Sequence, residues 1–340
     1  MRIVLDAMGS DRHPDPEVEA TLESAHLYEN DEIILVGQKP LLENKFRQSG
    51  IPKNVHLVHA SEVLEMTDKP AENARRKSDT SMAVGIELIR SGQADAFITA
   101  GNTGGAMANA LFHLGRIPGV RRPPLTAQFP VRDGSCVLLD IGANTDCKPE
   151  HLVQFATMGS VYAEKQLKRT SPKIALLSNG EEAGKGNELV KSTYPLLKEL
   201  FPNFIGNVEA KEVFKGEADV VVTDGFVGNV FVKSSEAATK FLNDLIRDML
   251  MSSFWTKLGG LLAKPAFDEI KKVLDPSEYG AAPLLGVNGL VFIGHGRSDA
   301  KALVNSIRNA RAAIEVNLLE ELRSVIQDRL STISVKNSDD

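Results

Sequence analysis

Residues 94–110 read ADAFITAGNTGGAMANA, and this stretch decides the fold class. The apolar run at residues 96–98 has the length of a buried strand, and a glycine-rich turn follows it from Thr99 to Gly105. A helical pattern then begins at Ala106. A strand, a glycine-rich turn and a helix N-terminus in this order are typical of anion-binding sites, because backbone N–H groups converge there.

The same order of strand, turn and helix recurs at three later places in the chain. Each of the four turns contains glycine and asparagine: Gly101 and Asn102, Gly142 and Asn144, Asn179 and Gly180, and Gly228 and Asn229. Strands alternate with helices elsewhere too, which predicts an open, mostly parallel α/β sheet with helices on both faces, in one piece or in two lobes. Ligands of such sheets bind at the carboxyl ends of the strands, so we expect the four turns to form one site.

The overall composition limits the class of protein. The chain has 340 residues, of which 42% are hydrophobic and 25% charged, as in ordinary globular proteins. We expect a single α/β domain over residues 1–340, with a helical hairpin inserted at 245–275 and a long terminal helix over 299–330. The net charge of −6 argues against nucleic acid as a partner.

Localisation is predicted from cysteine content and from apolar segments. Only Cys136 and Cys147 occur, which favours a reducing compartment. The chain enters a strand at residue 2, which leaves no room for a signal peptide, and residues 283–294 are too short and too glycine-rich to span a bilayer. We therefore expect a cytoplasmic protein.

The residue types in the four turns indicate what they bind. Glycine lets backbone N–H groups approach an anion closely, and asparagine adds a neutral donor. Lys185 and Lys233 follow two of the turns. This combination suits a phosphate and a developing oxyanion better than a nicotinamide or a metal. For any one turn, a tight bend that needs positive φ is an equal alternative.

Cofactors and metals are not expected. The chain has no Walker motif, and no G-x-G-x-x-G follows its first strand, so a dehydrogenase is disfavoured. Asp6, Asp11 and His13 form a weak metal candidate, since carboxylates at strand ends usually cap turns and helices. We expect no metal.

Six segments, taken in order, resemble the phosphate acyltransferase family of bacterial phospholipid synthesis. They are DAMGSD at 6–11, AGNTGGAMA at 100–108, DIGANTDCKPEHLVQFA at 140–156, SNGEEAGKGN at 178–187, TDGFVGNV at 223–230 and GHGRSDAKA at 294–302. The segment from Asp224 to Lys233 also resembles the D-x-x-x-G-N-x-x-x-K segment of phosphotransacetylases. The chain shows no clear departure from the family, although Ser10 stands where many relatives have a second glycine.

The resemblance implies a fold related to isocitrate dehydrogenase and phosphotransacetylase, and a homodimer. It also implies reversible transfer of a long acyl chain from acyl carrier protein to inorganic phosphate. The product, acyl phosphate, would feed the acylation of glycerol 3-phosphate by a separate acyltransferase. Transfer from acyl coenzyme A, and a non-catalytic scaffold that binds acyl carrier protein and the membrane, are the alternatives.

Phosphate is already a nucleophile, so such an enzyme must fix it beside the thioester and stabilise the tetrahedral oxyanion. We assign phosphate binding to the amides of residues 101–105 and 142–144, with Lys185 as counter-charge. The predicted substrate-binding residues are Gly101, Asn102, Thr103, Gly104, Gly105, Gly142, Asn144, Asn179, Gly228 and Lys233.

Further residues are assigned to the chemical step. Asn229 and the Gly228 amide are the candidates for stabilising the oxyanion, and Asp224 or His295 for the proton on the leaving thiol. Cys147 is an alternative, acylated nucleophile, although a bystander thiol is the favoured interpretation.

Two basic clusters stand out in this acidic chain, one containing Arg75 and Arg76 and the other Arg121 and Arg122. Charge clusters are usually solvated loop faces. Acyl carrier proteins are strongly acidic, however, so these clusters are candidate docking surfaces for that partner.

Residues 249–266 read MLMSSFWTKLGGLLAKPA. Trp255, Leu258 and Leu262 share one helical stripe, and residues 259, 260 and 265 (Gly, Gly and Pro) are expected to break the segment into a hairpin-like tip. A dimer or core contact is one interpretation. The other is an amphipathic tip that lies on the inner face of the cell membrane, where an apolar acyl phosphate is delivered.

Overall fold

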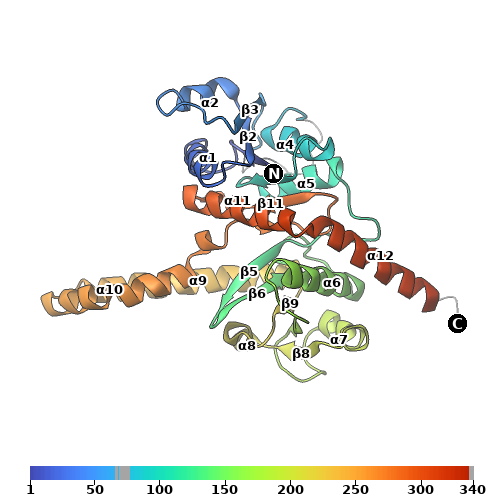
Figure 1. The fold of residues 1–340 in the computed structure, drawn as a ribbon. Coiled ribbons are helices and arrows are strands. Elements are labelled where there is room, and N and C mark those ends of the chain that lie inside the picture. Colours follow the sequence, from blue (N-terminus) through green and yellow to red (C-terminus); the bar gives the residue numbers. More distant parts are fainter. Residues whose placement is uncertain (66–67, 69–76, 337–340) are drawn as a thin grey trace.

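The computed structural model describes residues 1–65, 68 and 77–336, which form two lobes, each built on its own sheet (Figure 1). The sheet of the first lobe has the strand order β10-β11-β4-β1-β2-β3. Its strands are β1 (Arg2–Asp6), β2 (Glu32–Gly37), β3 (Val55–His59), β4 (Ala96–Thr99), β10 (Ala282–Pro283) and β11 (Leu290–Ile293). All neighbours pair in parallel except β10, which is antiparallel to β11 at the edge.

Side-chain alternation along these strands places helices on both faces. Ile3 and Leu5 lie in one apolar cluster and Val4 and Phe97 in another, because successive strand residues point to opposite faces. The first cluster is covered by α1 (Asp15–Leu27) and α11 (Ala300–Glu315), and the second by α4 (Ser81–Arg90) and α5 (Thr103–His113). The short helix α2 (Lys39–Lys45) packs beside β3.

The second lobe has the strand order β5-β6-β9-β7-β8. Its strands are β5 (Thr126–Val131), β6 (Gly134–Leu139), β7 (Ile174–Leu177), β8 (Phe204–Val208) and β9 (Val220–Val222). Strands β5 and β6 form an antiparallel hairpin, and the other pairs are parallel. Helices α6 (Pro149–Lys165), α7 (Glu188–Leu200) and α8 (Ala210–Lys215) cover this sheet. The predicted fold class, mostly parallel α/β with helices on both faces, is confirmed.

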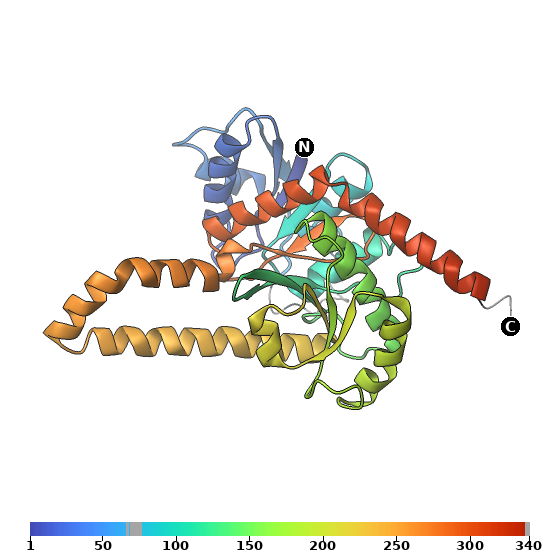
Figure 2. The ribbon, with the colours of Figure 1, turned by 60° about the horizontal axis from the view of Figure 1, so that its bottom comes forward.

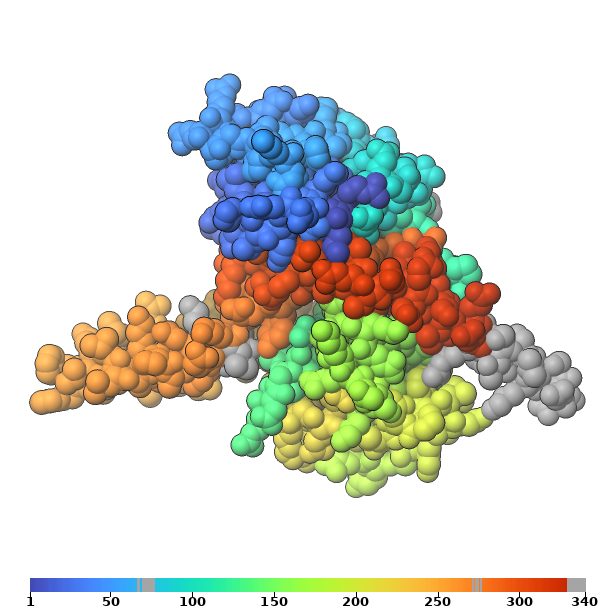
Figure 3. Space-filling view, in the orientation of Figure 1, coloured from blue at the N-terminus to red at the C-terminus, as the bar shows by residue number. Residues whose placement is uncertain are grey.

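The two lobes share one apolar core. A single cluster of buried side chains includes Leu5 of the first sheet and Leu139 of the second. Helices α11 and α12 (Leu318–Lys336) form a band between the lobes, shown in red and orange in Figure 3. Lys165 of α6 and Glu321 of α12 form an ion pair of 2.9 Å across this junction.

The predicted terminal helix over residues 299–330 is wrong as one element. It divides into α11 and α12, and Asn317 between them has φ of +51°. Asparagine is one of the few residues besides glycine that adopts this left-handed conformation readily, so the helix ends there.

The predicted helical insertion is a long hairpin that projects from the body (Figure 2). It consists of α9 (Gly225–Leu250) and α10 (Phe254–Leu274), followed by η1 (Pro276–Glu278), and therefore begins well before residue 245. The predicted break at Gly259 and Gly260 is wrong, because α10 runs through both glycines and through Pro265. The turn lies at residues 251–253, where Ser253 Oγ accepts the Thr256 N–H at 3.2 Å and caps α10.

Glycine in a helix costs only about 1 kcal/mol relative to alanine, so two glycines need not end one. Proline removes one helical hydrogen bond and bends the axis. Figure 2 shows such a bend part-way along α10. Among the described residues, no helix has both the length and the apolar character needed to cross a bilayer.

Candidate active site

Loops from both lobes meet beside the N-terminal turns of α9. In the first lobe, the Asp11 N–H donates to the Gly296 carbonyl and the Gly294 N–H to the Thr99 carbonyl, both at 2.7 Å. These bonds join the loops that follow β1, β4 and β11. In the second lobe, β6, β9 and β7 are neighbours, so the loops after them leave one edge of the sheet.

The loop after β6 is organised by a buried carboxylate, Asp140. Its Oδ1 accepts N–H bonds from Leu125, Gly142 and Ala143 at 2.9–3.1 Å, and its Oδ2 accepts the backbone and side-chain N–H groups of Asn144 at 2.7 and 2.8 Å. Burial raises the pKa of the Asp140 carboxyl, and these donors oppose the rise. The amides of residues 142 and 144 therefore already have an acceptor, and binding phosphate through them would require this network to rearrange.

The first turn of α9 fits against this loop. The Gly225 N–H donates to the Asn144 carbonyl at 2.8 Å, and Asn229 Nδ2 donates to the Ile141 carbonyl at 3.0 Å. A Cβ added at Gly228 would lie 1.9 Å from the Asp140 carbonyl oxygen, so only glycine allows this approach. Asn229 thus ties the first turns of α9 to the loop after β6, and its role in the reaction stays a prediction.

Gly228 and Asp224 were predicted to act on the substrate, but both form hydrogen bonds within α9. The Gly228 N–H donates to the Asp224 carbonyl at 3.0 Å, so it is used inside the helix rather than directed at an oxyanion. Asp224 Oδ1 accepts the N–H groups of Phe226 and Val227 at 2.9 Å, and the residue is only 8% exposed. Asp224 is the N-cap of α9, which makes it the weaker of the two candidates for the proton on a leaving thiol.

The turn after β4 has a similar cap. Asn102 Oδ1 accepts the Gly105 N–H at 2.9 Å, and the Gly101 N–H donates to Thr99 Oγ1 at 3.0 Å. Within residues 101–105, the amides of Thr103 and Gly104 then remain at the open end of α5, where helix geometry provides no intrahelical acceptor. The positive end of the helix dipole favours an anion at that point.

The turn after β7 carries Lys185 on an exposed loop. Asn179 Oδ1 accepts the Gly186 N–H at 2.9 Å and so shapes the turn itself. The Lys185 side chain lies over Gly180, where an added Cβ would be 2.7 Å from its Cγ. Among the described residues, no hydrogen bond or ion pair joins the Lys185 ammonium to another group. Its role as counter-charge stays a prediction.

His295 and Lys233 are brought together across the lobes. His295 Nε2 lies 3.7 Å from Glu236 Oε1, and Arg297 Nη2 lies 2.8 Å from Glu236 Oε2. Desolvation by its surroundings lowers the pKa of His295, Glu236 opposes this, and the positive charges of Arg297 and Lys233 add to it. The sequence analysis did not single out Asp140, Glu236 or Arg297.

Cys147 lies beside the same loop, and its Sγ donates to the Asn144 carbonyl at 3.4 Å. Burial raises the pKa of the Cys147 thiol to about 12, and the nearby carboxylates of Asp140 and Asp224 add to the rise. The thiol is therefore protonated at neutral pH, which argues against an acylated cysteine and for a bystander.

The predicted docking and membrane residues that the structure describes are exposed. Arg75 and Arg76 fall outside the described residues. Arg121 and Arg122 are exposed, and Arg121 Nη1 lies 2.8 Å from Glu150 Oε1. Trp255 and Leu262 near the hairpin tip are 77% and 78% exposed.

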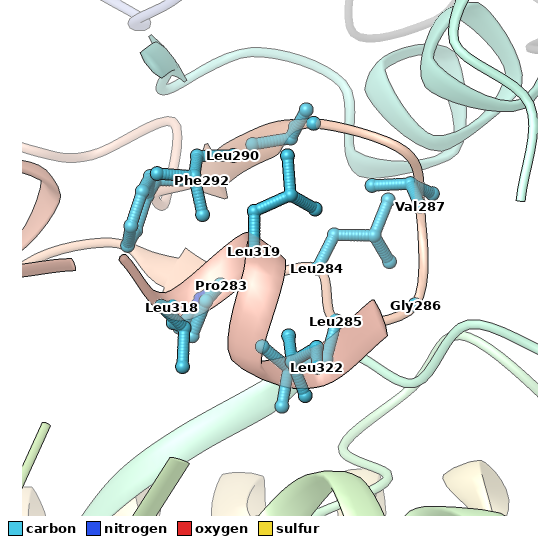
Figure 4. Close-up of a pocket in the computed structure, with 12 residues that line it drawn as sticks. Pro283, Leu284, Leu285, Gly286, Val287, Leu290, Phe292, Leu318, Leu319 and Leu322 are labelled. Carbon is cyan, nitrogen blue, oxygen red and sulfur yellow. The ribbon is translucent and has the colours of Figure 1, made fainter. Parts of the chain in front are cut away.

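Two cavities also lie away from the junction and contain none of the predicted site residues. The first is a void of about 10 Å³, where α12 covers β10 and β11; Figure 4 shows its apolar lining, with Leu318 and Leu322 on one side. A space of this size holds at most one water molecule. The second, of about 590 Å³, is an open hollow between the end of α6 and α11. Among the described residues, no group of three or more His, Cys, Asp or Glu is placed to hold a metal ion.

Solved structures with the same arrangement define the class of fold. A phosphotransacetylase from Staphylococcus aureus aligns with a TM-score of 0.57 at 17% identity, over 92% of this chain and 94% of the other. A branched-chain phosphotransacylase from Enterococcus faecalis aligns with a TM-score of 0.54 at 16% identity, over 92% and 100%. The chain therefore has the phosphotransacetylase-type α/β fold.

Sequence comparisons then give the family. The family described as fatty acid synthesis protein matches residues 1–321, and this chain belongs to it. A relative from Acidobacterium capsulatum named phosphate acyltransferase is 47% identical over 327 residues, covering 95% of this chain and 96% of the relative. One of the same name from Desulfitobacterium hafniense is 46% identical over 324 residues, covering 95% and 97%. The chain is an acyltransferase.

Proposed function

We propose that this acyltransferase moves a long acyl chain from acyl carrier protein to inorganic phosphate, reversibly, and releases acyl phosphate. The observation that carries the proposal is the junction of the lobes. There the β11 loop, which carries His295, is bonded to Thr99 at the end of β4, four residues before the N-terminal turn of α5, and the charge of Lys233 on α9 acts on His295. The relatives named phosphate acyltransferase support phosphate as the acceptor.

The chemical step follows from this arrangement. A phosphate oxygen attacks the thioester carbonyl carbon, the C–S bond breaks, and the sulfur leaves with the bonding electrons and takes up a proton. The amides of Thr103 and Gly104 hold the phosphate, with Lys185 as the predicted counter-charge and Lys233 as a second cation. Asn229 has a second side-chain N–H besides the one bound to Ile141, and this N–H stabilises the oxyanion.

His295 is the preferred proton donor to the leaving thiol. Its side chain is 56% exposed and reaches the junction, whereas Asp224 is buried and occupied as a cap. An imidazole can give and take a proton in the two directions of a reversible transfer.

The direct test supplies acyl-[acyl carrier protein] or acyl coenzyme A, with and without phosphate. Thiol release and acyl phosphate are measured by thiol titration and ³¹P NMR. Phosphate-dependent release with a lower KM for the protein thioester supports the proposal. Equal use of acyl coenzyme A favours the phosphotransacetylase-like alternative. If neither donor releases thiol, the non-catalytic scaffold is the alternative that is supported.

Acyl carrier protein is proposed as the donor because Arg121 and Arg122 are exposed in a chain of net negative charge. Reversing both charges is expected to raise KM for the protein thioester and to flatten its salt dependence, while KM for acyl coenzyme A stays constant. Since Arg121 pairs with Glu150, the single variant R122E serves as the cleaner comparison.

We also propose that the hairpin serves two apolar contacts. Trp255, Leu258 and Leu262 near its tip contact the inner face of the cell membrane, so the protein is cytoplasmic and peripherally bound. Phe241 and Leu242, exposed along the stem, contact a second copy of the chain in a homodimer. Acyl phosphate then passes at the membrane to the acyltransferase that acylates glycerol 3-phosphate.

The two contacts are tested separately. The double variant W255E/L258E is expected to lose flotation with anionic liposomes and to keep its mass by light scattering. The variant F241E is expected to halve that mass. Unchanged flotation in the first, or unchanged mass in the second, rejects the corresponding contact.

A further inference from the structure

Glu236 is a carboxylate that bridges the two lobes at the junction. It lies on α9, whose first turn is fixed to the second lobe by the bonds of Gly225 and Asn229. Its two oxygens reach different residues of the β11 loop in the first lobe. Oε2 lies 2.8 Å from Arg297 Nη2, and Oε1 lies 3.7 Å from His295 Nε2.

The two partners have different parts in this arrangement. The bond from Arg297 is a charge-assisted hydrogen bond, and it fixes the orientation of the carboxylate. That orientation directs the other oxygen at the imidazole. The Glu236 side chain is 25% exposed, so it holds this position partly shielded from water.

The charged groups around the imidazole come from three elements. Glu236 and Lys233 act on it from α9, and Arg297 from its own loop; the β1 loop is joined to the same loop through the backbone bond of Asp11 to Gly296. Among the groups that act on His295 electrostatically, Glu236 is the negative one, and Arg297 and Lys233 are positive. Loss of the Glu236 charge therefore leaves the imidazole beside two positive charges.

We propose that Glu236 is the positioning residue of the transfer reaction, acting through His295. Oε1 of Glu236 lies 3.7 Å from Nε2, so the negative charge faces that ring nitrogen, leaves Nδ1 for the substrate and stabilises the charged ring. The inference rests on the proposed function only for the identity of the reaction. The pairing of Glu236 with His295 is a property of the protein alone.

The proton path is then complete in both directions. In the forward reaction the imidazolium gives its Nδ1 proton to the departing sulfur, and the neutral ring keeps its Nε2–H facing Glu236. In the reverse reaction Nδ1 takes the proton from the attacking thiol, and the carboxylate stabilises the imidazolium that forms. Glu236 itself neither gains nor loses a proton.

The first experiment needs no substrate. The His295 resonances of full-length protein are titrated by ¹⁵N NMR in wild type, in E236Q and in D244N, with H295Q used to assign the signals. Asp244 is an exposed acid two turns further along α9 and serves as the matched control. The His295 pKa is expected to fall in E236Q, because a favourable negative charge is removed, and to stay constant in D244N. An unchanged His295 pKa in E236Q overturns the proposal.

The second experiment uses phosphate-dependent thiol release. We expect E236Q to lower kcat by roughly tenfold with KM for phosphate unchanged, and H295Q to lower it by about a hundredfold. The double variant should lose no more than H295Q, since Glu236 acts through the imidazole. The proposal is overturned if the kcat losses of the two single variants multiply in the double variant, or if kcat of E236Q equals that of wild type. In either case the role of Glu236 is to hold the lobes together.

The two experiments separate the possible failures. If neither thioester reacts with phosphate, the proposed function fails, while the titration still decides whether Glu236 controls His295. If turnover occurs and the titration shows no shift, the proposed function stands and the inference falls.

Discussion

Replacing Asp140 with asparagine tests whether the buried carboxylate organises the loop after β6. Five N–H groups point at its two oxygens, three at Oδ1 and two at Oδ2. Asparagine has one oxygen and one NH₂ group, so at least the two donors from Asn144 would face another donor. A hydrogen bond to a charged group contributes roughly 1.5–3 kcal/mol, so D140N is expected to lower the free energy of unfolding by about 3–5 kcal/mol.

The measurement is urea unfolding followed by circular dichroism, with D146N as the control, because Asp146 is an exposed acid of the same loop. The loss is a large part of the roughly 5–15 kcal/mol by which folded proteins are stable, so the midpoint should move clearly. Acyl transfer should fall as well, since Asn229 and Gly228 contact this loop. A D140N protein within about 0.5 kcal/mol of wild type would refute this account, because surface substitutions commonly fall in that range.

Three further predictions concern Gly228, Cys147 and Glu17. G228A forces a methyl group to within 1.9 Å of the Asp140 carbonyl and should cost about 1–3 kcal/mol in urea unfolding, with a loss of turnover; a fully active, equally stable variant contradicts the close approach. C147S should keep full turnover at neutral pH, because the thiol is protonated there and does not act as a nucleophile. A C147S protein that folds but is inactive would instead support the acylated-cysteine hypothesis. Burial raises the pKa of Glu17 from its usual 4.5 to about 7, so between these values the folded state holds a proton that the unfolded chain releases. The free energy of unfolding should therefore fall by about 3 kcal/mol as pH rises through this window in wild type, and not in E17Q. Urea midpoints at pH 4 and 8 check this with E19Q as control, and equal pH dependence in wild type and E17Q would contradict it.

The sequence predicted the junctions well because their signals are local. A short apolar run followed by glycine and asparagine, as at Thr99 to Gly105, specifies a strand end and a helix start within a few residues. Parallel strands then place such junctions at the carboxyl edge of their own sheet, and here β4 belongs to one sheet and β6, β7 and β9 to the other. The prediction failed at Gly259 and Gly260, where the same residue type was taken for a break inside a long helix.

The sequence did not predict which backbone N–H groups of the turns are already bonded within the protein. Glycine and asparagine near a strand end indicate available N–H groups, and the pattern does not show that Asp140 occupies those of Gly142 and Asn144. Glu236 was missed for a different reason. It is 61 positions from Arg297 along the chain, and only the folded junction brings the two together.

The hairpin has a mechanical consequence. Helix α9 is continuous over 26 residues, and its first turn carries Asn229 while its last turn reaches the tip. At about 1.5 Å per residue it is a stiff lever about 39 Å long. Any surface that restrains the tip also restrains the tilt of the first turn. Under the proposed function, reactant binding at one end and membrane attachment at the other would therefore share one free energy of coupling. Each then strengthens or weakens the other by the same factor.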